Sequence, residues 1–340
     1  MHLPTLDEIV IDTLHLYQDI PSLPKLDLSQ FHTPLVVGSG NGYYTGRILF
    51  RDVGAYFAVE SEVERKLENI PSITDVVVVS ASGEKHAPMI LEAAKKYGKK
   101  TFLISSSESS SGRTLADESI IMPKIREPYT YNTSTYFGYI LAEDPTLDLL
   151  ELEIFLSETL LGITQGVDWK SFTSFFIVLP DRFVLLREML EVKFIELFGR
   201  KVAHDTFSYE QMKHATTVIQ DEKELFLCFG NTSKIQYGEN QIDLPIFSED
   251  SQKSEIRGRE NFSQWAYSDL SNQEKSFSDK EVRSFSESST SYAAMMLVWY
   301  YLIGQIQKSL PPYFMDSIED YCIRAKAQSG FDIKPWVEIS

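Results

Sequence analysis

Short apolar runs alternate with helical patterns along the first half of the chain. Apolar positions recur at helical spacing in 6–17, 43–50 and 87–97. The intervening runs are rich in β-branched and aliphatic residues and stand at 34–38, 55–59, 75–80, 100–105 and 119–123. Strands that alternate with helices are typical of βαβ units, which build a parallel sheet. Because the runs lack alternating polar residues, we expect helices on both faces of this sheet.

A second passage of similar plan follows. The run 174–180 (SFFIVLP) predicts a strand, and 183–198 predicts a strong helix. The runs 202–206 and 223–229 predict two more strands. The order strand, helix, strand, strand suggests a second α/β unit.

A long helical stretch at 129–161, interrupted near Asp144-Pro145, closes the first passage. We therefore predict an α/β protein of two doubly wound units, each a mostly parallel sheet flanked by helices. The first unit is expected to cover 1–165 and the second 166–340, which suits the length of 340 residues.

The end of the chain departs from this plan. Ser, Gln, Asn, Glu and Lys dominate 248–291, which we interpret as a polar surface insert. The segment 292–306 (YAAMMLVWYYLIGQI) is apolar nearly all round. It predicts a buried helix, either in the core or in a subunit interface.

Charge and composition exclude several classes of function. The formal net charge of −17 disfavours a general nucleic-acid or anionic-membrane surface. No apolar run approaches the ~18 residues of a membrane span, and the first residues lack a basic region followed by an apolar one. Cys228 and Cys322 form no CxxC and are expected to be reduced thiols. We expect a cytoplasmic protein with no nucleic-acid or membrane partner.

Three hydroxyl-rich or glycine-rich loops follow predicted strands: 38–42 (GSGNG), 80–84 (SASGE) and 105–107 (SSS). Carboxyl ends of parallel strands meet at one edge of the sheet, where ligands bind. A phosphate needs helix N–H groups and hydroxyl donors, and glycine lets the backbone come close. The alternative for any one loop is an ordinary helix cap or turn. The candidate phosphate ligands in these loops are Ser39, Asn41, Ser80, Ser82, Ser105 and Ser106.

A dinucleotide-binding site is the competing interpretation, because Gly38-Ser39-Gly40 follows one strand and Glu60 ends the next. The fingerprint requires a third glycine three positions after Gly40, where Tyr43 stands. Motifs for nucleoside triphosphates, for zinc and for a serine nucleophile elbow are also absent from the sequence. We expect neither a metal nor a cofactor.

At these loops the chain resembles the sugar isomerase (SIS) domain family, whose double-domain members bind phosphorylated sugars. GSGNGY resembles that family's G-x-G-[TS]-S-Y loop, and SASGE resembles its S-x-S-G-[ED] phosphate loop. Arg126-Glu127 with Asn132-Thr133-Ser134-Thr135 resembles its E…A-S-T-K segment. In the second unit, 191–215 is similar to the isomerase domain of glucosamine-6-phosphate synthase. The similarity spans most of 30–220.

The resemblance implies a fold of two SIS-type units and a sugar-phosphate ligand bound by Ser80, Ser82 and Ser105. It implies that Glu196 moves a proton between C1 and C2 and that His214 assists ring opening, in its own or a partner's subunit. A homodimer is implied as well. From spacing alone, Glu196 would be a solvated carboxylate on an amphipathic helix, and His214 an ordinary surface histidine.

The C-terminal IKPWVEIS loosely resembles the lysine-bearing tail of the family, which makes Lys334 a third catalytic candidate. A plain exposed tail lysine is the alternative. His86 either contacts the phosphate or begins a helix, and we favour the second.

Four departures from the family pattern concern the ligand. Ala81 replaces a polar residue, and Lys85 replaces a threonine, so the phosphate loop loses a donor and gains a possible cation. Gly42 replaces a serine, and Ala215-Thr216 replaces Gly-Pro. The chain also begins at the isomerase half without an N-terminal cysteine nucleophile, so amidotransfer from glutamine is not expected.

The predicted activity is interconversion of aldose and ketose hexose or amino-hexose phosphates through an enediol. One positioned carboxylate can perform it as base and then acid, and a histidine suits the ring-opening protons. A deaminase or deglycase of the same fold, a non-catalytic sugar-phosphate sensor and a structural dimer with a degenerate site are the alternatives. A sensor usually carries a DNA-binding domain, and no basic helix-turn-helix segment precedes Thr33.

Overall fold

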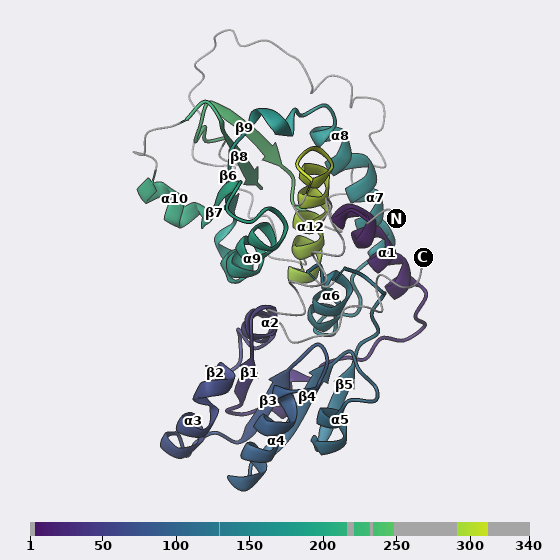
Figure 1. Ribbon diagram of the computed structural model, residues 1–340, viewed down its shortest axis with the longest axis vertical. Helices are drawn as coiled ribbons and strands as arrows, with labels where there is room; N and C mark the ends of the chain where they lie inside the picture. The colour runs from purple at the N-terminus through teal and green to yellow at the C-terminus, as the bar shows by residue number, and fades with distance from the viewer. Residues whose placement is uncertain (1–3, 129, 216–220, 232–233, 248–290, 312–340) are drawn as a thin grey trace, which may run out of the picture.

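The computed structural model describes residues 4–128, 130–215, 221–231, 234–247 and 291–311. Two parallel sheets flanked by helices lie one beyond the other in Figure 1. The predicted fold class is therefore confirmed.

The first sheet has five strands in the order β2-β1-β3-β4-β5, and each neighbouring pair is parallel. The strands in chain order are β1 Leu35–Gly38, β2 Tyr56–Ala58, β3 Asp75–Val79, β4 Lys100–Ser105 and β5 Glu118–Ile121. All five agree with predicted runs to within one or two residues.

Helices cover both faces of this sheet. They are α2 Asn41–Leu49, α3 Val63–Asn69, α4 His86–Lys96, α5 Ser111–Leu115 and α6 Thr133–Leu141. Alternate residues of β3 point to opposite faces, so Val76 and Val78 pack under α3 and α4 while Val77 and Val79 join the main core. Burial on both faces explains why the central strands β1, β3 and β4 have unbroken apolar sequences.

The second sheet has the order β7-β6-β8-β9 and is also parallel throughout. Its strands are β6 Ser174–Leu179, β7 Ala203–Ser208, β8 Glu224–Phe229 and β9 Asn240–Leu244. Strand β9 was missed by the sequence prediction. It is an edge strand in which only Leu244 is fully buried, so it lacks the apolar run that identified the others.

Two predicted helices are divided in the structure. The segment 183–198 consists of a 3₁₀ turn, Asp181–Leu186, followed by α9 Arg187–Phe198. The stretch 129–161 contains α6, then α7 Leu149–Ile154, a π-helical turn Phe155–Leu160 and α8 Leu161–Thr164. A turn follows α6, and the Asp148 side chain then caps α7 by accepting from Glu151 N at 3.0 Å.

The two halves share one core. Helix α12, Tyr292–Ser309, lies against α1 (Leu6–Gln18), α6 and α9 (Figure 1). Trp299 and Tyr300 on α12 are fully buried within the single chain, which places this predicted apolar helix in the core. The division near residue 165 stays a prediction, since the main core runs across it.

Residues 248–290 of the predicted polar insert and Lys334 lie outside the described residues. In the described part of the chain, no helix is both long and apolar enough to cross a membrane.

Replacing Gly42 by the serine of the family pattern is expected to lower the free energy of unfolding by about 1–3 kcal/mol. A Cβ at Gly42 would stand 2.7 Å from the Val79 carbonyl oxygen, so α2 would have to move away from β3. Urea denaturation of Gly42→Ser measures the loss. Gly54→Ser is the control, since its Cβ would meet nothing closer than 3.9 Å; equal stability of the two variants would contradict the close packing.

Candidate functional site

The structure brings the second and third serine loops together at the carboxyl edge of the first sheet. Ser106 N donates to Ala81 O at 3.2 Å, and Gly112 N donates to Gly83 O at 2.9 Å. The parallel pairing of β3 and β4 produces this neighbourhood, as the sequence predicted. The role of these loops in holding a phosphate stays a prediction.

The loop serines differ in what their hydroxyls do. Ser80 Oγ accepts from Gly83 N, and Ser82 Oγ accepts from Glu84 N, both at 3.2 Å. Both side chains are half-buried, and neither hydroxyl proton has an acceptor among the described residues. Ser105 is fully buried, and its Oγ accepts from Ser107 N at 3.3 Å. Ser80 and Ser82 can therefore donate to a ligand, whereas Ser105 shapes the loop from beneath.

Lys85, which replaces the threonine of the family pattern, stands at the start of α4. Lys85 is the N-cap residue with φ of 56°, and its side chain is exposed. His86 begins the helix, as favoured, and its Nδ1 lies 2.9 Å from Glu60 Oε2. Glu84 instead faces Ser111 on α5, whose hydroxyl and N–H hold the pKa of the Glu84 carboxyl below its usual range.

The first glycine loop leads directly into α2. Gly40 has φ of 51°, and Ser39 beside it is exposed. Asn41 is buried, and its Oδ1 has no hydrogen-bond partner within the described part of the chain. A ligand at the start of α2 could meet Ser39 directly.

Glu196 lies beside a buried lysine that sequence reasoning missed. Lys193 Nζ donates to Glu196 Oε2 and to Tyr131 O, each at 2.7 Å, and also to Thr130 O. The Lys193 side chain is fully buried, whereas the Glu196 side chain is 29% exposed. The Glu196 carboxylate therefore reaches solvent while the buried Lys193 ammonium holds it in place. The sequence signal for this ion pair was a lysine and a glutamate three residues apart on one predicted helix.

Glu127 caps the start of α6 next to this pair. Its carboxylate accepts from Thr133 N at 2.7 Å, from Ser134 N at 3.0 Å and from Ser134 Oγ at 2.6 Å. Burial raises the pKa of Glu127, while those bonds and the charge of Lys193 oppose the shift. Sequence analysis quoted Glu127 in a motif and gave it no role.

Tyrosines lie beside the serine loops and beside the Lys193–Glu196 pair. Tyr139 OH accepts from Ser106 Oγ at 3.1 Å and lies 3.5 Å from Ser80 O. The Tyr136 and Tyr139 rings are 6.0 Å apart edge to face. On α12, the centroid of the Tyr300 ring lies 5.2 Å from Lys193 Nζ. Helices α6, α9 and α12 thus place the carboxylate and the serine loops on one connected structure.

His214 lies apart from this cluster. It is exposed on α10 (Tyr209–Ala215), which packs on β6 and β7 at the outer side of the second sheet (Figure 1). No bond between His214 and Glu196 is found among the described residues. A role for His214 in a partner's site stays a prediction.

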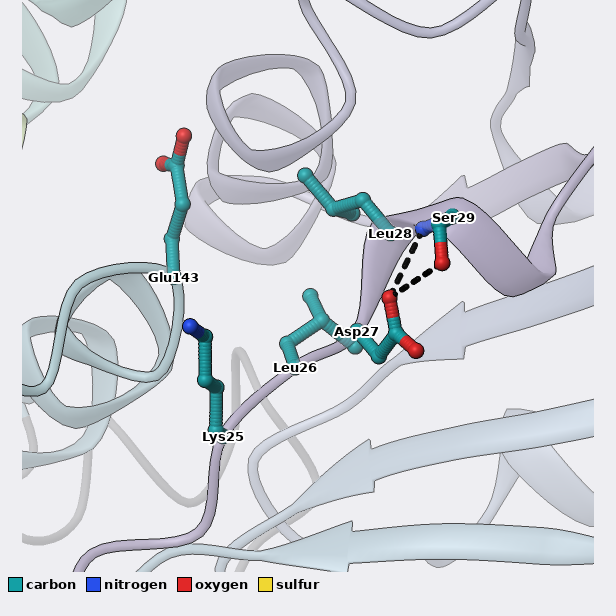
Figure 2. Close-up of a pocket in the computed structure, with 6 residues that line it drawn as sticks. All are labelled: Lys25, Leu26, Asp27, Leu28, Ser29 and Glu143. Carbon is teal, nitrogen blue, oxygen red and sulfur yellow. Dashed lines mark hydrogen bonds between the residues drawn. The ribbon is translucent and has the colours of Figure 1, made fainter.

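A separate hollow of about 540 Å³ is lined by 25–29 and Glu143. Figure 2 shows Asp27 accepting from Ser29 N at 3.0 Å and from Ser29 Oγ at 2.6 Å. Glu143 is bound by Arg51, so its carboxylate is already neutralised. None of the predicted site residues lines this hollow. Within the described residues, no group of three or more His, Cys, Asp or Glu side chains could hold a metal ion.

Comparison with known proteins identifies the fold. No protein-family model matches the chain, and no curated protein matches its sequence significantly. Among solved structures, it is similar to a glucosamine-6-phosphate deaminase from Thermotoga maritima, with 14% identity, TM-score 0.52 and coverage of 90% of this chain and 92% of that one. The C-terminal domain of a glucosamine-fructose-6-phosphate aminotransferase from Francisella tularensis gives 12% identity, TM-score 0.52 and coverage of 89% and 94%.

A tagatose-6-phosphate ketose/aldose isomerase from Escherichia coli gives 11% identity, TM-score 0.50 and coverage of 90% of this chain and 87% of that one. At these identities the likeness concerns the fold alone. The chain therefore has the double-SIS fold of phosphosugar proteins, and the predicted resemblance is confirmed at that level.

Proposed function

We propose that this protein is a phosphosugar isomerase that interconverts aldose and ketose forms of a hexose or amino-hexose phosphate. The observation that carries the proposal is the partly exposed Glu196 carboxylate, whose Oε2 lies 2.7 Å from the Nζ of buried Lys193. Helix α12, whose Tyr300 lies beside this pair, packs against α6, whose Tyr139 bonds Ser106 of the serine loops. The site thus combines groups suited to a phosphate with one oriented proton-transfer group.

The proposed reaction needs one carboxylate. After ring opening, Glu196 takes the proton from C2 of the aldose, the C2–H electron pair forms the C1–C2 double bond, and the C1 carbonyl pair moves onto O1 to give an enediolate. The O2 hydroxyl proton passes to O1 as the C2 carbonyl forms. Glu196 then returns the proton to C1, which gives the ketose with no net change in charge. Lys193 keeps the carboxylate in one orientation, because its ammonium is fixed by two backbone carbonyls. His214 of a partner subunit would serve ring opening in a homodimer.

The phosphate would be held at the edge of the first sheet. Ser80 and Ser82 have hydroxyl protons available, and the Lys85 ammonium is exposed beside them. Ser39, Asn41 and Ser106 border the same edge, and Ser105 supports it from below. Binding energy from the phosphate can then position the reacting carbons.

Proton NMR in D₂O tests the proposal. The wild-type protein is incubated separately with fructose 6-phosphate, glucose 6-phosphate, mannose 6-phosphate and glucosamine 6-phosphate. Deuterium appearing at C1 or C2 of any of them supports the enediol reaction and identifies the substrate class. Ligand-induced thermal stabilisation without exchange at either carbon would make the protein a sugar-phosphate binder and overturn the isomerase proposal for these sugars.

A deaminase is the second candidate, because the fold also matches a glucosamine-6-phosphate deaminase. Both reactions pass through proton transfer between C1 and C2. Ammonia release from glucosamine 6-phosphate, measured in the same incubation, distinguishes the two: a deaminase releases ammonia, and an isomerase of hexose phosphates does not.

Ser82→Ala is expected to weaken binding of the sugar phosphate by about 10- to 100-fold, since a hydrogen bond to a charged group contributes about 1.5–3 kcal/mol. Isothermal titration measures the affinity. Ser171→Ala is the control. Ser171 is exposed on a 3₁₀ turn outside the loops, and its hydroxyl donates to Asp168 O. Equal affinities of the two variants would remove Ser82 from the phosphate site.

A further inference from the structure

The hydroxyl of Tyr300 is a buried donor without a partner. Tyr300 is fully buried on α12, and its OH makes no hydrogen bond within the described residues. Leaving a buried polar group unpaired costs stability, so native proteins rarely keep one without a reason. Phenylalanine would fill the same space without that cost. The tyrosine therefore requires an explanation outside the packing of α12.

The surroundings of this hydroxyl are those of the proposed reaction centre. Lys193 Nζ lies 5.2 Å from the centroid of the Tyr300 ring and binds Glu196. Burial raises the pKa of Tyr300, and the charges of Glu196 and Glu127 raise it further. The hydroxyl therefore remains protonated and can only donate or accept a hydrogen bond, not supply a phenolate.

A second unpaired hydroxyl lies in the same cluster. Thr133 Oγ1 is fully buried and has no partner among the described residues, although the Thr133 N–H is bound by Glu127. The Tyr300 and Thr133 hydroxyls both lack a hydrogen-bond partner among the described residues. This is expected of a binding site in which a polar ligand supplies the missing partners. Sugars offer several oxygens for such donors.

We propose that the Tyr300 hydroxyl binds an oxygen of the sugar next to the carbon that Glu196 serves, an inference that rests on the proposed isomerase function. Glu196 is the solvent-facing member of the Lys193–Glu196 pair, so a sugar enters from its side. Tyr300 thereby belongs to the substrate-binding residues and selects ligands that carry an oxygen at this position.

Tyr300→Phe tests the inference because it removes only the unpaired oxygen. In the free protein the melting temperature is expected to stay equal or to rise, since no bond is lost. Affinity for the sugar phosphate that binds the wild type is expected to fall at least about tenfold, whereas affinity for inorganic phosphate stays unchanged.

Tyr301→Phe is the matched control. Tyr301 is the next residue on the same helix, is nearly buried, and lies near Asp7 of α1 rather than near Glu196. Its substitution should leave both affinities unchanged. If it weakens sugar binding as much as Tyr300→Phe does, the effect comes from α12 packing and the inference is overturned.

Three further outcomes are decisive. A Tyr300→Phe protein that melts clearly lower without ligand would show that the hydroxyl already has a structural partner, which overturns the inference whatever the ligand does. Unchanged sugar affinity would also overturn it and would assign the hydroxyl to a buried water. Failure of the wild type to bind any of the four sugar phosphates would instead overturn the proposed function, and this inference with it.

Discussion

Glu196→Gln is expected to slow deuterium exchange at C1 and C2 by about 10²- to 10⁴-fold, the usual contribution of a general acid–base group. The amide cannot accept the C2 proton. It can still accept a hydrogen bond from Lys193, so the fold and the binding of the sugar phosphate should be preserved. The rate of deuterium incorporation, followed by proton NMR at saturating sugar phosphate, measures the loss.

Glu188→Gln is the control for this substitution. Glu188 stands on the same helix, its side chain is 37% exposed, and it lies 3.6 Å from Arg47. Its loss should leave the exchange rate within about twofold, because a surface ion pair contributes little. Exchange that persists at the wild-type rate in Glu196→Gln would exclude Glu196 as the proton-transfer group, even with the sugar still bound.

Lys193→Met is expected to lower the free energy of unfolding by about 3–5 kcal/mol, the typical cost of removing one partner from a buried charged network. The Thr130 and Tyr131 carbonyls lose their donor, and Glu196 loses its counter-charge. Methionine keeps most of the volume, so the loss reports the bonds rather than a cavity. Urea denaturation of both proteins, fitted with the same m value, gives the difference in the free energy of unfolding.

Lys213→Met supplies the comparison at the surface. Lys213 pairs with Glu210 three residues away, as Lys193 pairs with Glu196, but both side chains of the surface pair are 63% exposed. Its loss should cost less than about 1 kcal/mol. Similar losses in the two variants would mean that Lys193 is not the support that holds Glu196.

The central strands β1, β3 and β4 of the first sheet were predictable because they are buried on both faces. Five apolar runs were recognised, and all five became strands. Strand β9 was not predicted because it is an edge strand that is mostly not buried, so it carries polar residues such as Asn240 and Asp243 in place of an apolar run. The split of 183–198 into a 3₁₀ turn and α9 also escaped, since a 3₁₀ turn at a helix start has nearly the same apolar spacing.

The sequence alone determined the chemistry available at the sheet edge. It placed Ser80, Ser82 and Ser105 after buried strands, and parallel strands bring such ends together whatever the rest of the fold does. It could not tell that Ser105 is fully buried while Ser80 and Ser82 are half-buried, with hydroxyl protons that have no acceptor among the described residues. That difference depends on which side of each loop meets solvent.

Only the tertiary structure decided which charges meet. Lys193, Thr130 and Tyr131 come from segments about sixty residues apart, and α12 supplies Tyr300 from beyond the polar insert. Local patterns carry the period of a helix or strand, because those depend on neighbours along the chain. The meeting of Lys193, Glu196, Glu127 and Tyr300 depends on packing between α6, α9 and α12, and no local pattern records it.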